Sequence, residues 1–142
     1  YRRYGDELLR PTVLYSPIIQ DCLRAGIPLH YGVHISGHGW AKLMRSPKPF
    51  AYVIERVPPI PQVFEFIQAM KKLSDKEMYK TFNMGAGFAV YVSKKWASRV
   101  CKIAQEHCVA AFVAGYVEKD PRKYVYIQPK SITFDSEDLK VR

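Results

Sequence analysis

The chain has 142 residues, 48% of them apolar, and carries a formal net charge of +9. A chain of this length predicts one domain that buries enough surface to fold without disulfides or a structural metal. Its content of charged and aromatic residues argues against a disordered protein, and the lack of an apolar stretch of ~20 residues excludes a membrane-spanning helix. The excess of Lys and Arg favours anionic partners such as nucleotides or phosphorylated metabolites, with a generally basic surface as the alternative.

The cysteines and the start of the chain bear on its cellular setting. Cys22, Cys101 and Cys108 form no CxxC pair, and an odd number cannot pair fully within one chain, which favours reduced thiols and a cytoplasmic protein. Cys101 and Cys108 are seven residues apart on an expected helix, so we interpret them as core residues, with metal or redox chemistry as the alternative. Because the chain opens with neither Met nor a signal-peptide pattern, we expect it to be a piece of a longer protein.

The first half of the chain alternates helix and strand signals. Apolar spacing after Pro11 predicts a helix that is either kinked at Pro17 or begins later, and Gly26 with Pro28 marks its end. A strand is expected over residues 30–35, a short helix over 40–45 and a second strand over 50–55.

The second half continues the alternation. A helix follows the prolines of residues 58–61, and Ser74 with Glu77 has the spacing of a capping box at the start of another. The further expected elements are a strand over 88–92, a helix capped by Ser93, strands over 109–117 and 124–127 joined by a hairpin at 119–122, and a weak strand over 132–134. Together they predict one α+β domain over 1–142, with a mixed β-sheet packed with helices.

Two glycine-containing loops carry the chemical signal. The first glycine loop (residues 34–39, HISGHG) follows a strand, and the second (residues 81–87, TFNMGAG) precedes one. Glycine lets the backbone turn sharply and lets amide groups approach an anion without obstruction by a Cβ. Tight turns without a ligand remain the alternative for each loop.

Three motifs occur in a characteristic order: ELLRPTVLY at 7–15, VHISGHG at 33–39, and EMYKTFNMGAGF at 77–88. With these motifs, residues 5–129 resemble the C-terminal domain of aminoimidazole ribonucleotide (AIR) synthetase, also called phosphoribosylformylglycinamidine cyclo-ligase. The resemblance implies an AIR synthase C-terminal-like fold. It also implies an N-terminal ATP-binding domain that is absent from this chain.

The resemblance implies a ligase of purine biosynthesis. In the family, ATP activates the amide oxygen of formylglycinamidine ribonucleotide, an amine closes the imidazole ring, and ADP and phosphate leave. The implied partners are this phosphorylated ribonucleotide, the missing domain and a second subunit of a homodimer. ATP and Mg²⁺ are expected in the intact enzyme, with none held by this domain alone, so the isolated chain is expected to be inactive.

The resemblance also places the candidate site residues. His34 is the candidate catalytic residue, and a histidine that shapes the turn through backbone bonds is the alternative. The candidates for binding substrate or phosphate are Ser36, Gly37, Gly39, Arg45, Thr81, Asn83, Gly85 and Gly87. Loop closure remains open for Asn83, and a solvated cation for Arg45. No residues have zinc-ligand spacing, and no metal ligand is predicted.

Departures from the family pattern suggest a divergent member. His38 stands where the family has glycine, Ser36 where it has threonine, and Ala41-Lys42 replaces a Glu-Asn pair. The alternative function is therefore a non-catalytic nucleotide-binding or regulatory module of the same fold. A third hypothesis is nucleic-acid binding by the basic, aromatic stretch at 122–126, but RNP-like and helix-turn-helix motifs are missing and we do not expect this partner.

Three further expectations concern single residues. His30 and His107 lie outside the motifs and are interpreted as ordinary surface or packing residues. If Gly87 has a backbone conformation that only glycine adopts, Gly87→Val should cost ~1–3 kcal/mol of strain.

Overall fold

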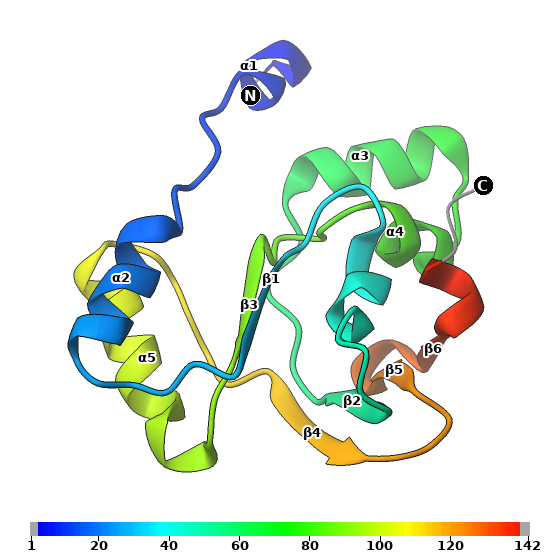
Figure 1. The fold of residues 1–142 in the computed structure, drawn as a ribbon. Helices are drawn as coiled ribbons and strands as arrows, with labels where there is room; N and C mark the ends of the chain where they lie inside the picture. The colour runs from blue at the N-terminus through cyan, green and yellow to red at the C-terminus, as the bar shows by residue number, and fades with distance from the viewer. Residues whose placement is uncertain (1–2, 140–142) are drawn as a thin grey trace.

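The computed structural model describes residues 3–139. Its helices are α1 (Tyr4–Leu8), α2 (Ser16–Arg24), α3 (Gln62–Lys71), α4 (Asp75–Thr81) and α5 (Lys94–Glu106), with short 3-10 helices η1 (Gly39–Met44), η2 (Gln128–Lys130) and η3 (Ser136–Leu139). Its strands are β1 (Tyr31–His34), β2 (Phe50–Ile54), β3 (Phe88–Tyr91), β4 (Gly115–Lys119), β5 (Tyr124–Ile127) and β6 (Ile132–Asp135). Figure 1 shows the β1–β3 ribbon between the α2–α5 pair and the rest of the fold.

The strands form two sheets. β1 and β3 make an antiparallel pair, and the larger sheet has the order β4-β2-β5-β6. β2 is parallel to β5 and antiparallel to β4, while β5 and β6 are antiparallel. The expected α+β architecture with a mixed sheet is confirmed.

The predicted hairpin between the strands now labelled β4 and β5 is wrong. The turn that joins them crosses the end of β2, where the Asp120 amide donates to the Pro49 carbonyl oxygen at 3.4 Å, and β2 lies between the two strands. Residues 51–54 of β2 are all buried, so this strand needs neighbours on both edges and cover on both faces. β4 also begins at residue 115 rather than 109.

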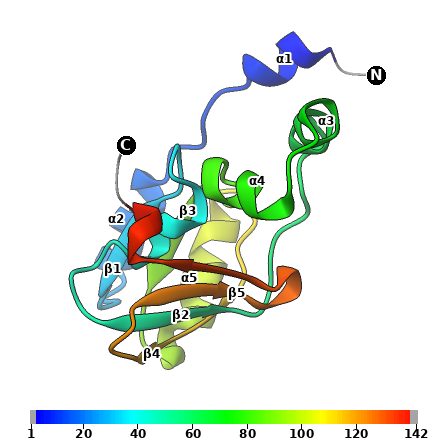
Figure 2. The same cartoon turned by 90° about the vertical axis from the view of Figure 1, so that its right-hand side faces the viewer.

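Two hydrophobic clusters hold the fold together. The larger one packs the four-stranded sheet against η1 and α4, and includes Met44, Tyr79 and Phe134, each with essentially no exposed surface. The smaller one joins α2 and α5 around Cys22 and Ile103. In Figure 2, α4 and η3 lie above the strands and α5 behind them. The first glycine loop leads directly into the larger cluster.

Several local predictions are resolved by the structure. The α2 helix begins at Ser16, which places Pro17 in its first turn, where a missing N–H costs nothing. The capping box is present, because Ser74 Oγ accepts from the Glu77 amide and the Glu77 carboxylate accepts from the Ser74 amide. Ser93 occupies the N-cap position of α5, but its hydroxyl lies 3.2 Å from His30 Nε2 and makes no cap bond.

The structure also bears on the interpretations of His107, Cys101 and Cys108. His107 follows the last residue of α5, and its Nε2 lies 2.8 Å from an Asp21 oxygen of α2. This hydrogen bond is the main cause of a lowered Asp21 pKa. Cys101 is half-buried on α5, but Cys108 follows the helix at a φ of 58° and is exposed, so its assignment to the core is wrong.

Among residues 3–139, no helix is long and apolar enough to cross a membrane.

Candidate functional site

The two glycine loops lie side by side. Pairing of β1 with β3 puts His34 opposite Phe88, and the Ile35 amide donates to the Gly87 carbonyl oxygen at 2.9 Å. A second link comes from the buried indole of Trp40, whose Nε1 donates to the Asn83 carbonyl oxygen at 2.9 Å. The structure therefore joins the two segments into one candidate site.

Two positions in the glycine loops, Gly39 and Gly85, require glycine because the backbone has a positive φ there and neighbouring backbone atoms leave no room for a Cβ. Gly39 has a φ of +51°, and a Cβ there would overlap the Tyr79 carbonyl oxygen and lie 2.6 Å from the Lys80 carbonyl carbon. Gly85 has a φ of +94°, and its Cβ would lie 2.8 Å from the Pro59 carbonyl oxygen. By contrast, a Cβ on Gly37 would meet no atom within 4 Å.

Tyr15 brings the first sequence motif to the same place. Its ring stacks on Phe88 at a centroid distance of 5.1 Å and lies 6.1 Å from the His34 ring. A Cβ on Gly87 would overlap the Tyr15 hydroxyl, whereas the Gly87 backbone is outside the left-handed region. The premise behind Gly87→Val is therefore wrong, because the glycine makes room for Tyr15. Burial raises the pKa of Tyr15.

The Lys42 side chain contacts the first glycine loop, and the residue is 8% exposed. Its ammonium group donates to the Ser36 hydroxyl and, at 3.5 Å, to the His34 carbonyl oxygen. Burial, and secondarily the charge of Arg45, lower the pKa of Lys42. The residue that departs from the family pattern thus holds the loop. The sequence analysis noted the departure at Lys42 but assigned no role to Lys42 or Tyr15. The available signals were that Tyr15 ends the first motif and that Lys42 follows the second motif by three residues.

The remaining candidate residues differ in their surroundings. His34 is exposed at the end of β1, and Arg45 is exposed at the end of η1 without a side-chain partner among residues 3–139. Thr81 is exposed at the last position of α4. The Asn83 side chain accepts from the Gly85 amide at 3.0 Å, so it shapes the second loop.

The donor chemistry of the loops suits an anion better than a metal ion. Neither loop contains Asp or Glu, the oxygen ligands that Mg²⁺ prefers. Within the described part of the chain, no three His, Cys, Asp or Glu side chains gather in a way that could hold a metal. Nearby positive charges and loop amides are instead typical of phosphate sites.

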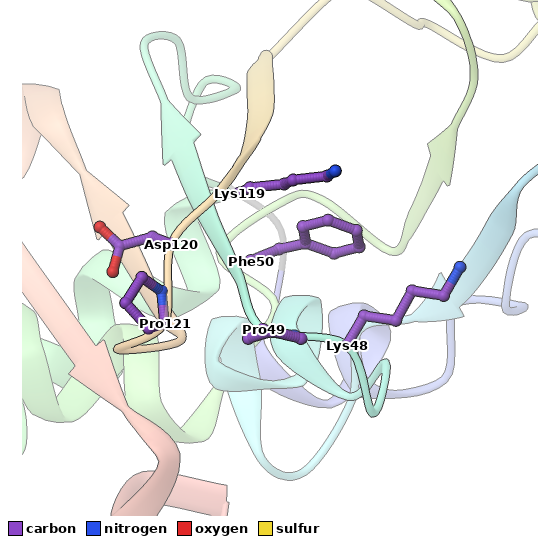
Figure 3. Close-up of a pocket in the computed structure, with 6 residues that line it drawn as sticks. All are labelled: Lys48, Pro49, Phe50, Lys119, Asp120 and Pro121. Carbon is purple, nitrogen blue, oxygen red and sulfur yellow. The ribbon is translucent and has the colours of Figure 1, made fainter.

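A separate hollow lies where the β4–β5 turn crosses β2, and it contains none of the sequence-predicted site residues. It is lined by Lys48, Pro49, Phe50, Lys119, Asp120 and Pro121. Figure 3 shows the two lysines extending on the side of the Phe50 ring, with the Asp120 carboxylate directed away. That carboxylate is bound by Arg122 through two bonds of 3.0 and 2.7 Å, which hold the pKa of Asp120 at about 2.

We expect Arg122→Gln to raise the pKa of Asp120 from about 2 toward its ordinary value of 3.8. The rise will be incomplete, because the residue 122 amide still donates to Asp120 Oδ1 at 2.9 Å. In the native chain the carboxylate's stabilising contribution is present above the ordinary pKa and is lost as the pH falls through the folded value. A carboxyl ¹³C NMR titration measures the shift. Lys123→Gln is the control, and an equal shift in it would contradict the assignment to Arg122.

The fold and these loops agree with a family assignment. The sequence model of the family described as AIR synthase related protein, C-terminal domain, matches residues 2–128. The chain therefore belongs to this family.

Curated relatives narrow the comparison. The chain is 41% identical over 114 residues to a phosphoribosylformylglycinamidine cyclo-ligase of Methanococcus vannielii, covering 80% of this chain and 32% of the relative. A cyclo-ligase of the same name from Methanococcus maripaludis strain C7 is 39% identical over 81% of this chain and 33% of its own length. A cyclo-ligase of the same name from Prochlorococcus marinus strain MIT 9313 is 31% identical over 80% of this chain and 34% of its own length. The chain thus spans about a third of the relatives it matches.

Proposed function

We propose that this chain is the C-terminal domain of a phosphoribosylformylglycinamidine cyclo-ligase of purine biosynthesis. The observation that carries the proposal is the meeting of all three family motifs at one place, through Tyr15, His34 and Gly87. The names and identities of the relatives support the same activity. In the proposed reaction ATP activates an amide oxygen, an amine of the same substrate attacks, and ADP and phosphate leave.

The loops would contribute binding and orientation. His34 is the proposed catalytic residue, because its imidazole is exposed where the motifs meet. The first loop is the proposed phosphate contact, supported by Gly37: the fold does not need a glycine there, while the absence of a side chain leaves the backbone open to an anion. Ser36, Arg45, Thr81 and Asn83 are the proposed polar contacts, and Gly39, Gly85 and Gly87 act by shaping the loops.

ATP, Mg²⁺ and the other partners belong to the intact enzyme in this proposal. A preceding domain would supply most of the ATP site, and the protein would work as a cytoplasmic homodimer. Exposed apolar side chains support a further contact surface near the start of the chain: Leu8 is 62%, Leu9 83% and Leu14 77% exposed. In Figure 1, α1 lies at the end of an extended segment, and the Tyr4 ring of α1 contacts the Phe66 ring of α3 at a centroid distance of 5.6 Å.

A chimera tests the proposed activity. Residues 2–128 replace the matching third of the Methanococcus vannielii enzyme, and ring closure is measured with formylglycinamidine ribonucleotide, ATP and Mg²⁺. We expect aminoimidazole ribonucleotide to form, and we expect His34→Ala to reduce its rate by about 10²-fold or more if the imidazole transfers a proton. His30→Ala is the matched control, since His30 is exposed near the start of the same strand and bonds to Ser93.

The outcomes separate the two candidate functions. A folded, dimeric chimera that binds ATP but forms no product would contradict the cyclo-ligase proposal and favour a non-catalytic nucleotide-binding module. Product formation that is equally fast in His34→Ala would keep the ligase and remove His34 from catalysis.

A further inference from the structure

We propose that Lys42 supplies the central positive charge of a phosphate-binding site at the first glycine loop, acting together with the Ser36 hydroxyl and with Arg45 at the rim. The assignment rests on the proposed function for its ligand class, a phosphate monoester. It assigns to this chain a cation that the family motif does not have at that position.

The surroundings of Lys42 are the first argument. An ammonium group has three N–H donors, and the described residues accept from it at two points, the Ser36 hydroxyl and the distant His34 carbonyl oxygen. Both acceptors are neutral. No carboxylate among residues 3–139 pairs with Lys42, although a lysine that is 8% exposed normally needs an anionic partner.

The position of Arg45 is the second argument. It follows Lys42 by three residues at the end of η1, and its charge acts unfavourably on the Lys42 ammonium. Two cations that repel each other beside a loop without acidic residues create a positive potential with no counter-ion in the described part of the chain. A dianion bound between them would remove the repulsion and accept the spare N–H.

The loop itself is the third argument. Ser36 bridges the ammonium group and the loop surface, because its hydroxyl accepts from Lys42 and keeps its own O–H to donate. Gly37 beside it leaves open space above the backbone. A phosphate can therefore receive the Ser36 hydroxyl, the Lys42 charge and loop amides at one point. Two cations and several neutral donors match a phosphate dianion better than a singly charged carboxylate.

The test is a titration of the 142-residue chain with inorganic phosphate, followed by NMR at the Gly37 amide and the Lys42 Cε–Hε group. Sodium chloride at equal ionic strength corrects for screening. We expect Lys42→Met, which keeps side-chain length but removes the charge, to weaken binding about tenfold or more. Lys48→Met, at an exposed lysine of the separate hollow, is the matched control and should change the affinity less than about twofold.

Folding of the variant is checked by its melting temperature. If Lys42→Met does not fold, the titration of the wild-type chain alone tests the proposal. Phosphate must then shift the Lys42 Cε–Hε resonance and leave that of Lys48 unchanged. Ser36→Ala gives a second variant at an exposed position and should also weaken binding. Unmoved Lys42 and Gly37 resonances, or equal binding by wild type and Lys42→Met, would overturn the proposal.

This readout is independent of turnover. Phosphate binding that is lost in Lys42→Met would stand even if the chimera formed no product, in which case the site serves another phosphorylated ligand. If the chimera is active but phosphate binding is the same in the wild type and in Lys42→Met, the proposed cyclo-ligase function stands and the proposed role of Lys42 is refuted.

Discussion

Gly39→Ala is expected to lower the free energy of unfolding by about 3–5 kcal/mol, since left-handed strain and overpacking add at this position. Alanine would have to adopt a φ of +51° with its Cβ overlapping the Tyr79 carbonyl oxygen and 2.8 Å from that of Lys80. These are backbone atoms of α4, so the clash cannot be relieved by turning a side chain. Chemical denaturation followed by circular dichroism measures the effect.

Gly37→Ala is the matched control for this prediction. It lies two residues away in the same loop, outside the left-handed region, with no atom within 4 Å of its Cβ position. We expect its stability to stay within about 0.5 kcal/mol of the wild type. Equal losses in the two variants would show that the loop does not pack against α4 as described.

Trp40→Ala is expected to cost about 3–5 kcal/mol, because a large side chain that is 2% exposed leaves a cavity between η1 and α4. The indole also contacts Tyr79 edge-on, with centroids 5.2 Å apart. Trp40→Phe isolates the link between the loops. It keeps an aromatic ring but removes the bond to the Asn83 carbonyl oxygen, for an expected loss of about 1–3 kcal/mol.

Trp96→Phe is the control for that bond. Trp96 lies on α5, and its Nε1 is buried without a hydrogen-bond partner among the described residues. Removing an unpaired buried donor should leave stability unchanged or raise it. If Trp96→Phe lowers the free energy of unfolding as much as Trp40→Phe does, both effects come from lost indole packing. The hydrogen bond between the loops would then contribute nothing measurable to stability.

Much of the site follows from local pattern. The first glycine loop follows a strand and the second precedes one, as the sequence predicts, and the capping box of Ser74 and Glu77 forms as its spacing predicts. Gly39 and Gly85 have the positive φ values that favour glycine. These features depend on short-range sterics and hydrogen bonds, which residue types a few positions apart already specify.

Other features could not be read from the chain. The segments around residues 119–122 have the signals of a hairpin, and only the buried environment of β2 shows that this strand intervenes. Gly87 looked like a backbone requirement, yet Tyr15, which is remote in sequence, accounts for it. Lys42 replaces a polar residue of the family pattern, and only the fold shows that its ammonium group donates to the Ser36 hydroxyl.

The sequence by itself determined the family resemblance, the α+β class and the two glycine loops, because these rest on motifs and on periodicities within single segments. Only the tertiary structure decided the strand order, the meeting of Tyr15, His34 and Gly87, and the burial of Lys42 without a carboxylate partner in the described chain. Each of these depends on which distant segments pack together, and that is set by the shape of the whole core rather than by any local pattern.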